Sequence, residues 1–312
     1  MIMPQGSIGQ APSSIPVKIG ARVRLAKGKL SLMLGFSSML GFLLASPQAP
    51  PVLLLLVGGV VLLAGGAASL NSLQEWRQDR LMRRTMFRPL PQGELNPGQA
   101  LRQAVLLIGC GLLLLSFVPG PLPVALGLLA VVLYNGVYTP LKAKTMLALV
   151  PGAVCGSLPV VIGWIAGGGQ AGSPVLGALI SLLVLWQVPH SWLVSLIYRD
   201  DVARSRMPQL LHHLSEPAMR RLLVPWVSAL AATMMLFTLL PLGLNATART
   251  VLLCAAILLA LVFLLQVFLH YSLNYRTLFI FLNLIFILFI LIVCAARISL
   301  PSVAGHPLGN IV

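Results

Sequence analysis

Acidic residues are almost missing from this chain: six Asp and Glu stand among 312 residues, and charged residues of both signs make up only 9%. A soluble globular domain carries about 25% charged residues. Hydrophobic residues instead reach 58%. This balance excludes an ordinary soluble domain. It predicts an all-α, polytopic membrane protein, because a backbone that spans lipid satisfies its own hydrogen bonds most simply as a helix.

Cysteine is also scarce, and its four copies lie far apart inside apolar segments, at Cys110, Cys155, Cys254 and Cys294. Zinc sites and disulfide frameworks need cysteines at short, patterned spacings. The chain has no such spacing, so we expect the thiols to contribute to packing. The longest polar stretches are residues 1–29, 71–100 and 198–220. None of them predicts a second, soluble domain.

Nine apolar segments are each close to the 17–25 residues that span a bilayer. They cover roughly residues 30–46, 51–70, 101–118, 121–138, 147–166, 174–197, 221–241, 250–270 and 277–296. We therefore expect an N-terminal cytoplasmic tail (1–28), a domain of nine transmembrane helices (29–298) and a C-terminal tail (299–312). The first 17 residues are uncharged and polar, which predicts disorder.

Basic residues are abundant and one-sided. The 21 Lys and Arg give a net charge of +15, which would suggest nucleic acid in a soluble protein. In a membrane protein, basic residues set the orientation in the membrane and contact anionic lipid headgroups. We therefore expect membrane lipid, and not nucleic acid, as the partner of these residues. With the N-terminus cytoplasmic, all of them except Arg249 and Arg297 fall inside. This predicts a multi-pass protein of the cell (inner) membrane with an external C-terminus.

Three oxygen-bearing side chains, Asn71, Glu75 and Asp79, follow the second apolar segment at intervals of four residues. On a helix this spacing puts them on one face, about 6 Å apart per step. Such a stripe can hold Mg²⁺ while water and a phosphate group complete its shell. Arg84 and Arg88 repeat the spacing, and arginine forks suit diphosphate oxygens. An ordinary juxtamembrane helix with charge pairs explains the pattern equally well.

A second acidic pair, Asp200 and Asp201, follows the sixth apolar segment. Adjacent helical residues point about 100° apart, so we expect one to face the site and the other to pair with an arginine. His190, within that segment, is more often a hydrogen-bonded structural residue than a ligand. Tyr138 and Lys142, one turn apart, could grip a phosphate or simply anchor a helix at the interface.

Together these segments resemble the UbiA superfamily of membrane prenyltransferases, and within it the protoheme farnesyltransferase (heme O synthase) branch. The resemblance covers nearly the whole chain, from residue 25 to the second acidic pair. The stripe is similar to the family pattern Asn-x-x-x-Asp-x-x-x-Asp. It is followed at 82–90 by a match to Met-x-Arg-Thr-x-x-Arg-Pro-Leu. Residues 138–142, 152–164 and 186–190 match the heme branch.

The resemblance implies a UbiA-like bundle with its active site at the cytoplasmic side and Mg²⁺ as cofactor. It implies farnesyl transfer from farnesyl diphosphate to a vinyl group of protoheme, giving heme O. The implied catalytic residues are Asn71, Glu75, Asp79 and Asp201, of which the three carboxylates are metal ligands. Diphosphate binding falls to Arg84, Arg88, Tyr138 and Lys142, and acceptor binding to His190. Association with heme A synthase or terminal oxidase assembly is a further expectation.

The chain departs from the family pattern at several positions. Glu75 replaces an Asp, Arg77 stands where the heme branch commonly has another Asp, Val160 replaces a proline, and Tyr198 replaces an Arg. Two alternatives therefore stay open: a UbiA-type prenyltransferase acting on an aromatic quinone precursor, and a catalytically degenerate paralogue that binds heme or helps to assemble an oxidase. A transporter is disfavoured, since the carboxylates gather at one face rather than at mid-span.

Overall fold

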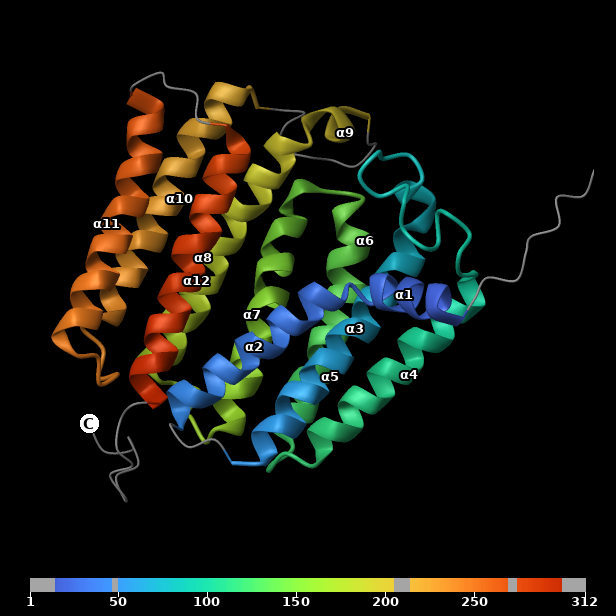
Figure 1. Cartoon of the computed structure of the whole chain (residues 1–312), viewed down its shortest axis with the longest axis horizontal. Coiled ribbons are helices and arrows are strands. Elements are labelled where there is room, and N and C mark those ends of the chain that lie inside the picture. Colours follow the sequence, from blue (N-terminus) through green and yellow to red (C-terminus); the bar gives the residue numbers. More distant parts are fainter. Residues whose placement is uncertain (1–14, 47–49, 205–213, 269–273, 299–312) are drawn as a thin grey trace, which may run out of the picture.

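The computed structural model describes residues 15–46, 50–204, 214–268 and 274–298, which form a helical bundle with no strand among them (Figure 1). The first part of the chain comprises α1 (Ile15–Leu25), α2 (Gly28–Ala45), α3 (Val52–Asp79), α4 (Pro97–Ser116), α5 (Leu122–Val131), the π-helical turn η1 (Val132–Tyr138), α6 (Thr139–Lys142) and the short 3₁₀ turn η2 (Met146–Ala148). The second part comprises α7 (Leu149–Ala166), α8 (Pro174–Ile197), α9 (Arg199–Arg204), α10 (Glu216–Phe237), α11 (Ala246–Phe268) and α12 (Tyr275–Ile298).

Within the described part of the chain, 9 helical stretches are long and apolar enough to cross a membrane. They lie where the nine apolar segments predict them, and α8 has its predicted limits. The fourth span runs without a break through α5, η1 and α6. The chain is therefore an all-α, multi-pass membrane protein. The largest difference is in α3, which continues past the predicted end at residue 70 as far as Asp79.

The N-terminal segment contains a helix that the sequence pattern did not predict, since α1 occupies residues 15–25 of the expected tail. The rest of the predicted disorder, residues 1–14, lies outside the described residues, as does the C-terminal tail 299–312. All four cysteines are free thiols. Cys110 and Cys254 are exposed on the outer surface of their helices, so the expected packing role applies only to Cys155 and Cys294, which are partly buried.

Two large apolar cores hold the bundle together, and α2 and α7 belong to both; a smaller third core packs α1 against the segment after α3 and the start of α4. One core joins α2, α3, α4 and α7 through residues such as Phe42 and Ile162. The other joins α2 and α7 to α8, α10, α11 and α12 through residues such as Leu44 and Val160. The two shared helices approach each other so closely that a Cβ on Gly163 would overlap the backbone of α2. Small residues at such crossings let helices pack without a hydrophobic driving force in lipid.

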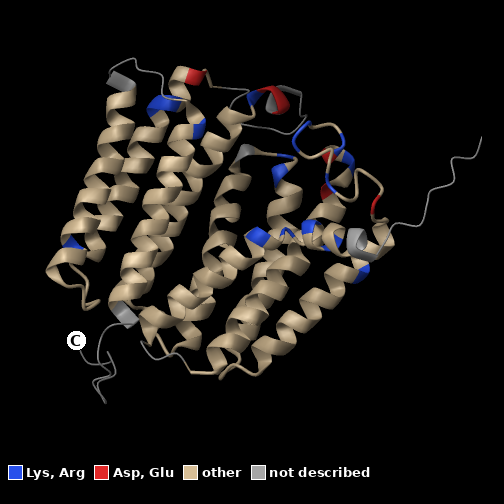
Figure 2. Cartoon of the chain, viewed as in Figure 1, with Lys and Arg blue, Asp and Glu red and all other residues tan. Residues whose placement is uncertain are grey.

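The fourth span changes its hydrogen-bond pattern in η1, next to the polar end of α3. The N–H of Thr139 donates to the carbonyl of Tyr134, five residues earlier. The Thr139 hydroxyl donates to the same carbonyl over 2.8 Å, and the following Pro140 has no N–H to offer. Such π-helical turns recur at functional sites. Charged residues also gather toward this end of the bundle, beside α9 and the segment after α3 (Figure 2).

Candidate active site

The last turns of α3 carry the three polar residues that were predicted to share one face. Asn71, Glu75 and Asp79 are only 2%, 7% and 1% exposed. A buried carboxylate is strongly destabilising unless it is paired and hydrogen-bonded. Each member of this stripe therefore needs a partner, and each has one on another element.

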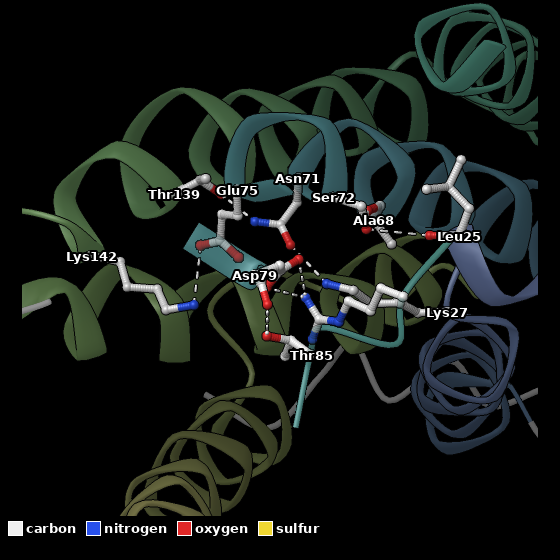
Figure 3. A network of polar contacts seen from close by, with 11 residues as sticks. Leu25, Lys27, Ala68, Asn71, Ser72, Glu75, Asp79, Thr85, Thr139 and Lys142 are labelled. Carbon is white, nitrogen blue, oxygen red and sulfur yellow. Dashed lines mark hydrogen bonds and ion pairs between the residues drawn. The ribbon is translucent and has the colours of Figure 1, made fainter. Parts of the chain in front are cut away.

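Asn71 connects the stripe to the N-terminal segment and to the fourth span (Figure 3). Lys27 Nζ donates to Asn71 Oδ1 over 2.7 Å. The Asn71 amide donates in turn to Thr139 Oγ1 over 3.1 Å. The carbonyl oxygen of Asn71 is thus held against a cation, while its amide nitrogen is fixed beside the π-helical turn.

The two carboxylates of the stripe also meet cations. Lys142 Nζ donates to Glu75 Oε1 over 3.1 Å. Arg88 Nη1 lies 2.9 Å and 2.8 Å from the two carboxylate oxygens of Asp79. The hydroxyl of Thr85 donates to the backbone carbonyl of Asp79 over 2.9 Å and folds the following segment back over the helix end. Three cations from separate parts of the chain therefore converge on one stripe (Figure 3).

Lys27 is a member of the site that the sequence pattern did not single out. It lies directly before α2 with φ 49° and ψ 50°, a left-handed conformation that turns the chain between α1 and α2. Burial, and then the nearby guanidinium of Arg88, lower the pKa of Lys27 to about 8. Its place in the stretch 25–29, where the family resemblance begins, is the only sequence signal for this role.

The predicted diphosphate-binding residues are divided between two places. Arg88 and Lys142 lie in the stripe network. Tyr138 lies one turn before Lys142, and its ring stacks on Tyr134 with the centroids 5.5 Å apart. Arg84 instead covers the ring of Tyr198, with its guanidinium carbon 5.2 Å from the centroid.

Of the second acidic pair, only one residue is buried, while the expectation that the other pairs with an arginine stays a prediction. Asp201 is 8% exposed, whereas Asp200 is exposed. The carboxylate of Asp201 accepts the backbone N–H groups of Arg83 and Arg84 over 3.2 Å and 3.0 Å. Among the described residues, no three His, Cys, Asp or Glu side chains are grouped as a metal site. The ligand set of Glu75, Asp79 and Asp201 therefore stays a prediction.

The donors of the stripe nevertheless suit a magnesium ion. Glu75 and Asp79 offer carboxylate oxygens and Asn71 offers its amide oxygen, and Mg²⁺ prefers oxygen ligands. Magnesium in phosphate-binding sites is commonly held by one or two carboxylates, with substrate phosphates and water completing its octahedron. Two carboxylates and an amide oxygen on one helix face fit this chemistry without a third carboxylate.

His190 lies on α8, apart from the stripe network, and faces α12. Its Nδ1 is 3.1 Å from Asn283 Oδ1, and its ring lies 4.5 Å from that of Trp186 and 4.8 Å from that of Phe279. The buried indole N–H of Trp186 has no hydrogen-bond partner among the residues that the structure describes. His190 is thus hydrogen-bonded, as a structural histidine would be, but beside a polar group that is unsatisfied.

Comparison with known proteins gives this arrangement a family. The model of the UbiA prenyltransferase family matches residues 34–290. The chain belongs to the UbiA prenyltransferase family. It is similar to the protoheme IX farnesyltransferase of Geobacter sulfurreducens, with 40% identity over 217 residues, or 68% of this chain and 78% of that protein. It is also 34% identical to that of Aromatoleum aromaticum over 240 residues, covering 75% and 77% of the two chains.

Solved structures share the fold. A digeranylgeranylglyceryl phosphate synthase superimposes with a TM-score of 0.73 and 16% identity, covering 91% of this chain and 99% of that one. A UbiA homologue from Archaeoglobus fulgidus, bound to GPP and Mg²⁺, gives a TM-score of 0.62 at 16% identity, covering 90% of this chain and 100% of that one. The helical bundle is therefore the UbiA fold.

Proposed function

We propose that this chain transfers a farnesyl group from farnesyl diphosphate to a vinyl group of protoheme, in an Mg²⁺-dependent reaction that gives heme O. The observation that carries the proposal is the buried stripe of Asn71, Glu75 and Asp79, with a lysine or arginine at each member. A metal-bound diphosphate needs oxygen ligands for the metal ion and cations for its own phosphate oxygens, and the stripe and its partners offer both. The similarity to protoheme IX farnesyltransferases supports the acceptor.

The first chemical step breaks the bond between the allylic carbon and the diphosphate oxygen, and both electrons leave with the diphosphate. Bound Mg²⁺ would act as a Lewis acid on the diphosphate oxygens. Lys27, Arg88 and Lys142 can neutralise the charge that builds on the leaving group. All three already lie within hydrogen-bond distance of stripe oxygens, so they need little rearrangement to do so.

The second step forms a carbon–carbon bond from the π electrons of the heme vinyl group to the allylic carbon. Water then adds to the remaining cationic carbon and loses a proton, which gives the hydroxyethylfarnesyl side chain. We assign acceptor binding to His190, since its Nδ1 bond to Asn283 fixes the ring and leaves Nε2 for a ligand. The unsatisfied N–H of Trp186 is a second polar group at the same place.

Purified protein incubated with farnesyl diphosphate, protoheme and Mg²⁺ should form heme O, and chelation of Mg²⁺ should abolish product, measured by chromatography and mass spectrometry of extracted hemes. Prenylation of 4-hydroxybenzoate with protoheme untouched would favour the quinone-precursor alternative. Saturable heme binding without product would favour the degenerate paralogue.

In the same assay, His190→Ala should raise KM for protoheme by about tenfold, because the variant loses one directional bond to the acceptor. KM for farnesyl diphosphate should stay unchanged.

Lys27→Met should raise KM for farnesyl diphosphate by about tenfold or more, because it removes a half-buried cation that faces the stripe. Lys29→Met is the matched control: it removes an exposed lysine two residues away. Steady-state kinetics at saturating Mg²⁺ measures both variants. Equal KM values for the two would remove Lys27 from the diphosphate site.

We further propose that the protein lies in the cell (inner) membrane, with the N-terminus and the stripe cytoplasmic and the C-terminus external. The support is the concentration of Lys and Arg on one side of the nine spans. Reporter fusions at Gly93 and at Val312 should show opposite sidedness, and the same sidedness at both positions would overturn the orientation.

Association with heme A synthase or terminal oxidase assembly is tested by copurification from membranes with the tagged chain.

A further inference from the structure

Asp201 makes an unusual pair of contacts for a residue expected to hold an ion. Its two carboxylate oxygens accept the consecutive backbone N–H groups of Arg83 and Arg84, over 3.2 Å and 3.0 Å. These contacts join positions 117 and 118 residues apart in the chain. Charge-assisted bonds from a carboxylate to backbone N–H groups are among the stronger hydrogen bonds in proteins. Asp201 therefore holds the main chain of the segment that follows α3.

A second contact acts on the same segment from the same side. The guanidinium of Arg84 lies over the ring of Tyr198, three residues before Asp201, with 5.2 Å between its central carbon and the ring centroid. A guanidinium at this distance from an aromatic face is attracted to the ring's π electrons. Tyr198 thus contacts the side chain of Arg84, while Asp201 binds the backbone of the same segment.

Arg199, which lies between Tyr198 and Asp201, is connected to α10 and α12 by polar contacts at Glu216. Arg199 Nη1 donates to Glu216 Oε2 over 3.0 Å, and Arg220 Nη2 donates to Glu216 Oε1 over 3.0 Å. The hydroxyl of Tyr275 donates to the same carboxylate. Glu216 therefore ties the start of α9 to α10 and α12. The segment after α3, which lies beside α9 (Figure 1), is in this way connected through α9 to α10 and α12.

We propose that Asp201 is a positioning residue: together with Tyr198 it fixes the segment 80–90 over the end of α3, so that Arg84 and Arg88 are placed for the diphosphate. This inference rests on the proposed function for the identity of the diphosphate. It gives Tyr198, which stands where the family usually has arginine, a role in this chain as the platform for Arg84. One carboxylate is sufficient for this role, because the two oxygens of Asp201 can accept both backbone N–H groups. The second acidic motif can therefore position the segment with Asp201 alone.

Tryptic cleavage after Arg83 and Arg84 in the purified, full-length protein tests the grip directly. Both side chains are exposed, and the backbone N–H groups of both residues are held by the carboxylate of Asp201. Asp201→Ala should accelerate cleavage at these bonds by about tenfold relative to cleavage after Lys144, an exposed residue in another loop. Tyr198→Ala should accelerate it less, and Tyr198→Phe, which keeps the ring, should behave as wild type. Asp200→Ala is the matched control and should leave the ratio unchanged.

Kinetics then separates positioning from metal binding. Asp201→Ala should raise KM for farnesyl diphosphate by about tenfold, with kcat lowered less than about threefold and the Mg²⁺ concentration for half-activation unchanged. If Asp201 instead holds the ion, half-activation will need more Mg²⁺, kcat will fall by about a hundredfold, and cleavage after Arg84 will stay slow. That result, or equal cleavage in Asp201→Ala and Asp200→Ala, overturns the proposal.

Should the wild-type protein transfer no prenyl group to any acceptor, the proposed function falls but the cleavage ratios still decide whether Asp201 holds the segment. The binding measurement is then the protection that inorganic pyrophosphate with Mg²⁺ gives against tryptic cleavage after Arg83 and Arg84, in place of KM. Wild type should be protected at lower pyrophosphate concentration than Asp201→Ala. Equal protection would overturn the positioning role. Asp201→Asn, which keeps the side-chain shape and one oxygen acceptor, serves as a second variant if Asp201→Ala does not fold, and it should show intermediate cleavage.

Discussion

Asp79→Asn should lower farnesyl transfer by about a hundredfold or more while the protein remains folded in the membrane. Asp79 is 1% exposed, and Arg88 lies within 2.9 Å of both its carboxylate oxygens. The substitution preserves the shape of the side chain but removes its charge. It therefore deprives the site of a metal ligand and of the partner that orients Arg88. The measurement is Mg²⁺-dependent product formation at saturating substrates, beside a thermal melt of the variant.

Two companion variants make the result specific. Asp200→Asn removes the charge of an exposed acid outside the stripe and should keep most of the activity. Glu75→Asp keeps the charge and restores the family's usual residue, so it should be milder than Asp79→Asn, although the shorter side chain draws away from Lys142. If Asp79→Asn and Asp200→Asn were equally active, the stripe would be only a charge-paired helix face and the catalytic interpretation would have to be abandoned.

Gly163→Ala should have the largest effect on stability. An added Cβ would overlap the backbone carbonyl of Ser38 on α2, and a backbone atom cannot move aside as a flexible side chain can. Because α2 and α7 belong to both cores, forcing them apart disturbs the whole bundle. Overpacking of this kind costs about 3 kcal/mol, which lowers Tm by roughly 5 °C for a chain of this size. Thermal melting in detergent micelles measures the change.

Gly109→Ala is the matched control for this crossing. Gly109 also lies within a membrane-spanning helix, α4, but it is exposed, and a Cβ added there meets no atom within 4 Å. The substitution should leave Tm within about 2 °C of wild type, as surface substitutions away from special features usually do. A Gly163→Ala protein as stable as Gly109→Ala would show that the two helices have room to separate.

Composition and periodicity were sufficient for the class of fold. Scarcity of charge and nine apolar segments predict nine membrane-spanning helices, because a lipid solvent leaves a spanning chain little choice but to form helices. The stripe of Asn71, Glu75 and Asp79 was also visible in the sequence. A helix repeats nearly every four residues, so that spacing alone places the three on one face.

Only the tertiary structure decided what meets the stripe. The cations Lys27, Lys142 and Arg88 come from the turn before α2, the end of the fourth span and the segment after α3. Their convergence depends on how the spans cross and on a left-handed turn at Lys27, neither of which has a local sequence period. The contact between Asp201 and the backbone of Arg83 and Arg84 could not be predicted for the same reason. Local spacing determines which residues share a helix face, whereas long-range packing determines which charges from other helices come to lie opposite that face.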